Sequence, residues 1–174
     1  MKVFVTVGTH EQPFQRLLDA VARAVSDRPH HEWVVQWGVG VWEQRGERVV
    51  ASSAYFGACE MRQHLEWADV VVSQASPGTV FAALEAGAWP VVVGRRASLR
   101  EHVDDHQVLF ARELDRRGLA TDLRSASALV PELDRQSSFP RPARRQLCTA
   151  AASRSAENAR RFRADVWANL QELT

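Results

Sequence analysis

The sequence has no long apolar segment and almost no cysteine. The apolar run near the N-terminus extends only from Val3 to Val7 before Gly8, which is too short for a signal peptide or a membrane span. Cys59 and Cys148 lie far apart without a CxxC pattern or a Cys/His cluster, so neither a disulfide framework nor a cysteine zinc site is predicted. We expect a cytoplasmic protein with two passive thiols that are buried or half-buried.

Lysine is nearly absent as well. Lys2 is the one lysine among 22 basic residues, and 21 acidic residues leave a net charge of +1. Residues 141–163 are rich in arginine, which is compatible either with a surface for nucleic acid, acidic lipid or a partner, or with an ordinary solvated helix face. Because the acidic residues Glu157, Asp165 and Glu172 interrupt the basic run of the C-terminal tail, we expect no nucleic-acid partner.

A repeated order of strand, turn and helix organises the chain. The runs expected as strands are apolar throughout, which predicts parallel strands covered on both faces. For 174 residues this predicts a single α/β domain with a doubly wound, mostly parallel, Rossmann-like sheet. We assign residues 1–121 to the sheet core, and residues 122–174 to a linker and a long C-terminal helix of the same domain. Strands are expected at residues 3–7, 33–37, 48–51, 70–72, 91–93 and 119–121, and helices at residues 13–25, 60–67, 79–86, 105–117, 126–133 and 144–173.

Ligands of such sheets bind beyond the carboxyl ends of the strands, so the turns after the first, fourth and fifth strands are the places to look for a site. The first turn, Gly8–Gln12, ends a strand and opens a helix, where free N–H groups can bind an anion. It lacks the GxGxxG pattern of a dinucleotide site. Within it, His10 is either a catalytic group or an exposed turn histidine.

The turn after the fourth strand, Ser73–Thr79, combines small residues with a Gly-Thr pair at a helix start. Small residues let a diphosphate approach the backbone, and the Thr79 hydroxyl and nearby N–H groups can donate to it. A tight turn with Thr79 as a helix cap is the structural alternative, and it stays open at this point.

The third turn, Arg95–Gln107, is rich in hydrogen-bonding groups. A sugar site needs carboxylates that accept hydrogen bonds from hydroxyls, and amides or imidazoles that donate or accept them. Arg95 and Arg96 are the alternative candidates for stabilising a leaving diphosphate. The potential metal ligands are His102, Asp104, Asp105 and His106. We recognise no HxxxH, HExxH or similar metal-binding spacing in this turn and therefore expect no metal there.

Three segments occur in the same chain and in this order: Val5–Phe14, Ser73–Thr79 and Glu101–Gln107. Together they resemble the family 28 glycosyltransferase C-terminal domain, which is the C-terminal half of a GT-B fold. The resemblance is greatest to the small subunits of two-subunit enzymes of bacterial polysaccharide synthesis and of eukaryotic dolichol-linked chitobiose synthesis. It covers residues 1–120 and is strongest in the third segment, whereas residues 121–174 match only in being a helical tail.

The resemblance implies a UDP-sugar donor site and an inverting transfer that needs neither a metal nor a cofactor. It also implies a membrane-anchored partner subunit that binds a lipid-linked or polysaccharide acceptor and recruits this chain to the inner face of the membrane. His10 is the catalytic candidate on this chain, although the general base itself is expected on the partner. The expected donor-binding residues are Gly8, Thr9, Ser76, Gly78, Thr79, Arg95, Glu101, His102, Asp105, His106 and Gln107.

Two positions depart from the family pattern. Gln74 stands where relatives usually have His, and Ala82 stands where relatives have a Glu that holds the ribose hydroxyls. Loss of that carboxylate should cost about 1.5–3 kcal/mol of nucleotide binding. Either Glu85 substitutes for it, or the donor differs, or activity is weakened. The alternative function is therefore a non-catalytic regulatory or binding subunit of a glycosyltransferase complex.

The expected C-terminal helix carries an apolar stripe. Such a stripe is buried either on its own domain or on another chain. The residues that we assign to partner docking are Phe162, Val166, Trp167 and Leu170.

Overall fold

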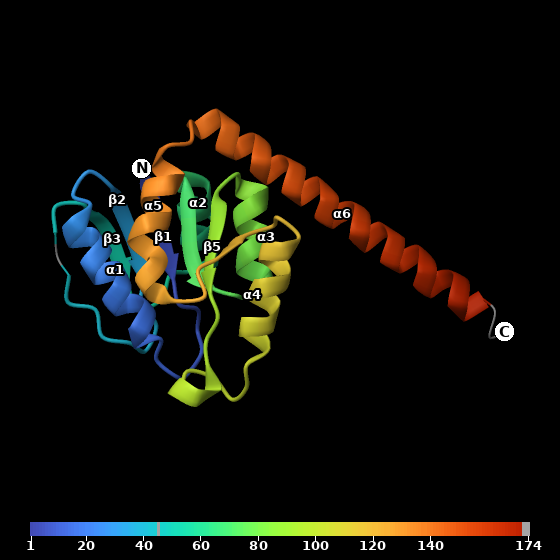
Figure 1. Ribbon diagram of the computed structural model, residues 1–174, viewed down its shortest axis with the longest axis horizontal. Coiled ribbons are helices and arrows are strands. Elements are labelled where there is room, and N and C mark those ends of the chain that lie inside the picture. Colours follow the sequence, from blue (N-terminus) through green and yellow to red (C-terminus); the bar gives the residue numbers. More distant parts are fainter. Residues whose placement is uncertain (45, 172–174) are drawn as a thin grey trace.

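The computed structural model describes residues 1–44 and 46–171, with the side chains of helix α6 described as far as Glu157 and at Arg160. The chain alternates strands and helices, as Figure 1 shows. The strands are β1 (Lys2–Thr6), β2 (Glu32–Gln36), β3 (Val49–Ser53), β4 (Val70–Gln74), β5 (Trp89–Val93) and β6 (Thr121–Asp122). The helices are α1 (Gln15–Asp27), α2 (Ala58–Trp67), α3 (Pro77–Ala86), α4 (His106–Arg116), α5 (Leu129–Ser137) and α6 (Arg141–Gln171), with short 3₁₀ turns η1 (Ala97–Leu99) and η2 (Ala126–Ala128).

The six strands form one sheet in the order β3-β2-β1-β4-β5-β6, and all five pairings are parallel. This is the strand order of a doubly wound Rossmann-type sheet. The predicted fold class is therefore confirmed. From β1 the chain moves to β2 and β3 on one side and then returns to β4 on the other side. In sheets of this kind ligands bind where the strand order reverses, which here is at the carboxyl ends of β1 and β4.

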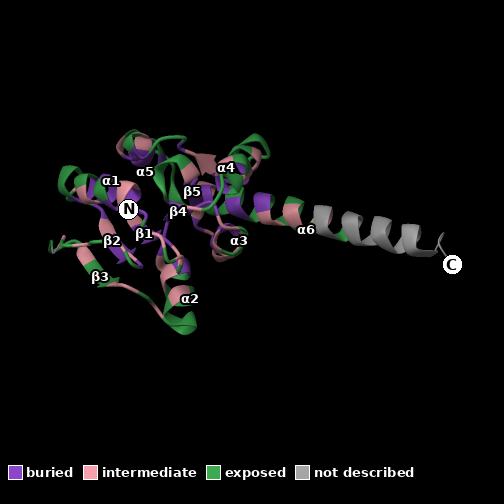
Figure 2. Cartoon of the chain, turned by 90° about the horizontal axis from the view of Figure 1, so that it is seen from below, coloured by how far each residue is buried: buried purple, intermediate pink, exposed green. Residues whose placement is uncertain are grey.

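Both faces of the sheet are covered, which explains why its strands are apolar along their whole length. On one face, α1 and α5 pack over the side chains of Val5, Val72 and Val91. On the other face, α2, α3, α4 and the first part of α6 cover Phe4, Val71 and Val92. In Figure 2 the buried residues, in purple, gather along the sheet and the inner sides of the helices.

Residues 122–140 contain the helix that we expected at residues 126–133, which the structure forms as η2 and the longer α5. Leu129 and Leu133 are fully or almost fully buried and belong to the same core cluster as α1 and β1. The reason is the helical spacing of their apolar side chains, which turns α5 toward the sheet. Core packing therefore continues beyond residue 121.

The first half of α6 is attached to the domain, and some of its arginines have structural contacts. Cys148 and Ala151 are fully buried in the cluster that contains Leu84 of α3. Arg141 and Arg144 both approach the Asp69 carboxylate, at 2.9 and 3.7 Å. These two arginines are therefore part of the attachment of α6. None of the described helices is long and apolar enough to cross a membrane.

The two cysteines differ in exposure. Cys148 is buried as expected, and burial raises its pKa to about 11. Cys59 is exposed at the start of α2, so the expectation that both thiols are at least half-buried is wrong for this residue. The Cys59 side chain is exposed to solvent in the first turn of α2, whereas Cys148 packs against α3.

Candidate functional site

The turns after β1, β4 and β5 lie at the same edge of the sheet, because these strands are parallel neighbours. Gly8 of the first turn has a φ of +74°, and a Cβ at this position would lie 2.3 Å from Nε2 of Gln74. The first turn and the β4 turn are therefore in contact, and only glycine fits both the backbone conformation and the space. Thr9 is exposed beside Gly8.

The N-terminus of α3 is open to solvent. Gly78 is exposed, and a Cβ added there would meet nothing within 4 Å. Ser76 occupies the N-cap position, yet within the described part of the chain no side chain caps this helix. Thr79 follows in the first turn. The free N–H groups and the helix dipole make this end a suitable place for an anion such as a diphosphate.

Buried polar atoms lie next to this helix end. Among the described residues, Ser73 Oγ and Gln74 Oε1 have no hydrogen-bond partner, although both residues are more than nine-tenths buried. A buried polar atom without a partner costs free energy unless water or a ligand satisfies it. The carboxyl end of β4 thus has unused hydrogen-bonding capacity beside the N-terminus of α3.

Arg95 holds two of the turns together. Its side chain is 1% exposed and donates to the carbonyl oxygens of Val7 (2.8 Å), Gln12 (2.7 Å) and Glu101 (3.0 Å). It also packs over the ring of Phe14, 4.7 Å from the centroid. The geometry therefore argues against the direct phosphate contact expected for Arg95, because its guanidinium N–H groups are largely committed to backbone carbonyls. Its position indicates a residue that positions the turns.

Glu101 has a similar structural task. Its carboxylate, on a residue 5% exposed, accepts two hydrogen bonds from Arg16 at 2.9 and 2.8 Å. It accepts a third from the backbone N–H of Arg96 at 3.0 Å. This pairing attaches α1 to the third turn. These three hydrogen bonds leave the Glu101 carboxylate little capacity to accept from a sugar hydroxyl. Binding of the donor sugar by Glu101 stays a prediction.

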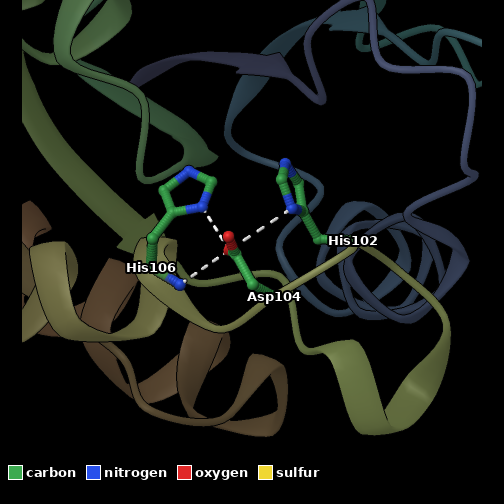
Figure 3. A group of neighbouring side chains, drawn as sticks. All are labelled: His102, Asp104 and His106. Carbon is green, nitrogen blue, oxygen red and sulfur yellow. Dashed lines mark hydrogen bonds and ion pairs between the residues drawn. The ribbon is translucent and has the colours of Figure 1, made fainter.

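Three imidazoles and a carboxylate gather in the same region. The ring centroids of His10 and His102 are 4.5 Å apart, and those of His102 and His106 are 4.6 Å apart. The Asp104 carboxylate lies between His102 and His106, as Figure 3 shows, with Oδ1 3.6 Å from His102 Nδ1 and hydrogen-bonded to His106 Nδ1. Burial, with the neighbouring imidazoles His10 and His106, lowers the pKa of His102, which favours the neutral ring.

This cluster shows what the sequence reasoning missed. His102 and His106 have three residues between them, which is an HxxxH spacing, so the interpretation that this turn has no metal-binding spacing is wrong. The structure brings His102, Asp104 and His106 close enough for one ion, with potential ligand atoms within 4.8 Å of one another. The HxxxH spacing was therefore the feature of the sequence from which this possible metal site could have been predicted.

The remaining residues of the third turn begin helix α4. Gln107 is 8% exposed, and its Oε1 accepts from the backbone N–H of Arg95 at 3.4 Å. Asp105 is exposed and accepts from the N–H of Ala97 at 2.9 Å. The structure therefore brings the expected donor-binding residues of all three turns to one edge. The side chains assigned to partner docking, Phe162, Val166, Trp167 and Leu170, lie outside the residues whose side chains are described.

Fold and site together define the class: a Rossmann-like domain that corresponds to the C-terminal half of a GT-B glycosyltransferase. The sequence matches the model of the glycosyltransferase family 28 C-terminal domain over residues 2–161. The chain therefore belongs to this family. A search of the curated proteins finds no match.

Solved glycosyltransferases share the fold at low sequence identity. The glycosyltransferase of kitacinnamycin is 19% identical with a TM-score of 0.62, covering 92% of this chain and 43% of that one. The calicheamicin glycosyltransferase CalG4 is 17% identical with a TM-score of 0.64, covering 95% and 44%. Glycosyltransferase SsfS6 from Streptomyces sp. SF2575, complexed with thymidine diphosphate, is 19% identical with a TM-score of 0.58, covering 90% and 37%. The present chain thus spans less than half the length of these proteins.

Proposed function

We propose that this chain binds a UDP-sugar at the carboxyl edge of its sheet, as the donor-binding subunit of an inverting, metal-independent glycosyltransferase. The observation that carries the proposal is the open N-terminus of α3, with Gly78 exposed and the helix uncapped by any described side chain, at the switch point of a family 28 domain. The thymidine diphosphate bound to SsfS6 supports a nucleoside diphosphate as the ligand class.

In this proposal the catalytic contribution of the chain is electrostatic. As the bond to the sugar breaks, negative charge develops on the leaving diphosphate. The N-terminal dipole of α3 and the N–H groups near Gly78 and Thr79 stabilise that charge without a metal. Arg96, which is exposed, is better placed than the buried Arg95 to add positive charge from solvent.

The acceptor side is assigned to a partner. The chain covers 37–44% of the length of the solved glycosyltransferases described above, so the second half of a GT-B cleft lies outside the residues described here. We assign it to a membrane-anchored subunit that binds a lipid-linked or polysaccharide acceptor, supplies the general base and recruits this chain to the membrane. His10 lies 4.5 Å from the His102 ring at this edge and is the catalytic candidate on the present chain.

The second candidate function is a non-catalytic regulatory or binding subunit, and the position of Glu85 favours it. Glu85 lines the same groove between α2 and α3 as Ala82. It is, however, about one helical turn further from the start of α3, roughly 5 Å along the axis. A carboxylate at residue 85 is therefore poorly placed to replace the missing ribose ligand.

Calorimetric titration of the purified chain with UDP, thymidine diphosphate and ADP tests the donor site. We expect saturable binding of UDP, weakened at least about tenfold by Gln107→Ala, because a buried hydrogen-bonding side chain at the site is lost. Gln63→Ala, an exposed change on α2, is the matched control and should bind UDP as the wild type does. Absence of binding at millimolar nucleotide would favour the non-catalytic subunit.

A further inference from the structure

The arrangement of His102, Asp104 and His106 is unusual because one carboxylate oxygen faces two imidazole nitrogens. Asp104 Oδ1 lies 3.6 Å from Nδ1 of His102 and is also the acceptor for Nδ1 and for the backbone N–H of His106. Figure 3 shows the carboxylate between the two rings, with both Nδ1 atoms turned toward it. Two imidazoles and one carboxylate are a common set of protein ligands for a transition metal.

One of these nitrogens lacks a partner. The His102 side chain is 11% exposed, and its Nδ1 is buried without a hydrogen bond to any described residue. A buried nitrogen in this state costs free energy. The distance of 3.6 Å to Asp104 is too long for a hydrogen bond. It is, however, close to the separation of two ligands on one tetrahedral ion with bonds of about 2.0–2.2 Å.

We propose that His102, Asp104 and His106 form a zinc site, and that zinc bound there inhibits donor binding. The ion replaces the proton between Asp104 and His106 and gives His102 Nδ1 the partner that it lacks. Three protein ligands leave a fourth position for water. Two imidazole nitrogens and one carboxylate favour zinc and similar transition metals over magnesium or calcium, which prefer oxygen ligands.

The backbone around the three ligands is held in place, which favours a preformed site. Glu101, adjacent to His102, is fixed by its paired hydrogen bonds to Arg16. His106 opens helix α4, and its backbone N–H donates to Asp104 at 3.0 Å. An ion at this site therefore needs small side-chain movements and little reordering of the chain.

The inhibitory part of this inference rests on the proposed function. His102 and His106 belong both to the metal cluster and to the expected donor site, so a zinc ion and a donor sugar would compete for the same side chains. Competition is reciprocal, because each ligand lowers the affinity of the other by the same factor.

Zinc binding can be measured without a nucleotide. Untagged protein, freed of metal by a chelator, is titrated with zinc in competition with a chromophoric zinc indicator. We expect one site per chain. Loss of a group that only supports a metal ligand typically weakens binding about 10- to 100-fold, so His102→Ala and His106→Ala should each weaken it at least about a hundredfold.

His30→Ala, which removes an exposed histidine outside the cluster, is the matched control and should leave zinc affinity unchanged. Asp104→Asn is a milder change that should preserve the fold, because the amide oxygen can still accept from the His106 N–H while the negative charge is lost. We expect at least about tenfold weaker zinc binding in this variant. Equal zinc affinity in the wild type and the three cluster variants, or no saturable binding, would overturn the proposed site.

Inhibition is tested by repeating the UDP titration with and without zinc. In the wild type, zinc should weaken UDP binding at least about tenfold at concentrations well above its own dissociation constant. In the Asp104→Asn variant, UDP affinity should be nearly the same with and without this zinc concentration. Because free UDP can itself bind zinc, the variant also shows how much of the effect comes from zinc bound to UDP. An equal zinc effect in both proteins refutes the competition. A chain that binds zinc but no UDP refutes the proposed function and leaves the metal site standing.

Discussion

At the scale of single residues, the site depends on positions where the backbone lies very close to a neighbour. A Cβ on Gly94 would lie 2.7 Å from Cα of Val108, so the end of β5 and the start of α4 approach each other through a glycine. Gly8 similarly lies under the Gln74 side chain. Both glycines bring chain segments together that any side chain would separate.

Replacing Gly8 with Ala should lower the free energy of unfolding by about 1–2 kcal/mol, because a residue with a Cβ is strained at positive φ and would collide with Gln74. Gly78→Ala is the control in the same region. It has open space and lies in the first turn of α3, so Ala should raise stability by about 0.5–1 kcal/mol. Urea unfolding of both variants measures the difference. Equal changes in the two variants would contradict the assigned strain.

At the scale of elements, α3 links the sheet to the expected nucleotide. It begins at Pro77, directly beyond β4, and runs away from the carboxyl edge, so its early residues face the site and its later ones do not. Ala82 lines the groove between α2 and α3 together with Met61 and Leu65. Ala82 therefore has apolar neighbours at the position where relatives carry the Glu that binds the ribose.

Ala82→Glu should strengthen UDP binding about tenfold, because it restores a carboxylate that can accept two ribose hydroxyl hydrogens. Calorimetry with UDP and with 2′-deoxy-UDP separates this effect from a general change, since the gain should be smaller for the deoxynucleotide. Glu85→Ala should leave UDP affinity unchanged. A large loss in Glu85→Ala would instead show that this residue has taken over the ribose contact.

At the scale of the whole molecule, His31 links distant parts of the chain. It is 1% exposed, and its ring lies near Ser137 of α5, with 3.4 Å between Nε2 and the hydroxyl. Burial lowers its pKa to about 4 from the ordinary 6.5. The folded protein therefore keeps this ring neutral at pH values where the unfolded chain protonates it.

The stability that comes from His31 is fully present above pH 6.5 and is lost as the pH falls toward 4. Between these values its contribution should decline by at most about 1.4 kcal/mol per pH unit. Urea unfolding at pH 7, 6 and 5 measures this slope. His31→Gln should show a shallower dependence, whatever its absolute stability. An unchanged slope in this variant would assign the pH dependence to other groups.

The sequence alone determined the architecture, because the apolar strand runs and helical spacings are local patterns that survive without knowledge of the contacts. It also located the three turns, since the carboxyl ends of parallel strands meet at one edge. Element bounds shifted by a few residues at several ends, and α5 was underestimated because burial of Leu129 depends on a partner far away in sequence.

Only the tertiary structure decided what individual side chains in those turns do. Arg95 and Glu101 have the right chemistry for a donor ligand, yet packing turns them onto carbonyl groups and Arg16. The proximity of His10, His102 and Asp104 depends on how two turns from different parts of the chain fold together. Residue type shows what a side chain is able to bind, but its neighbours in space determine what remains free to bind.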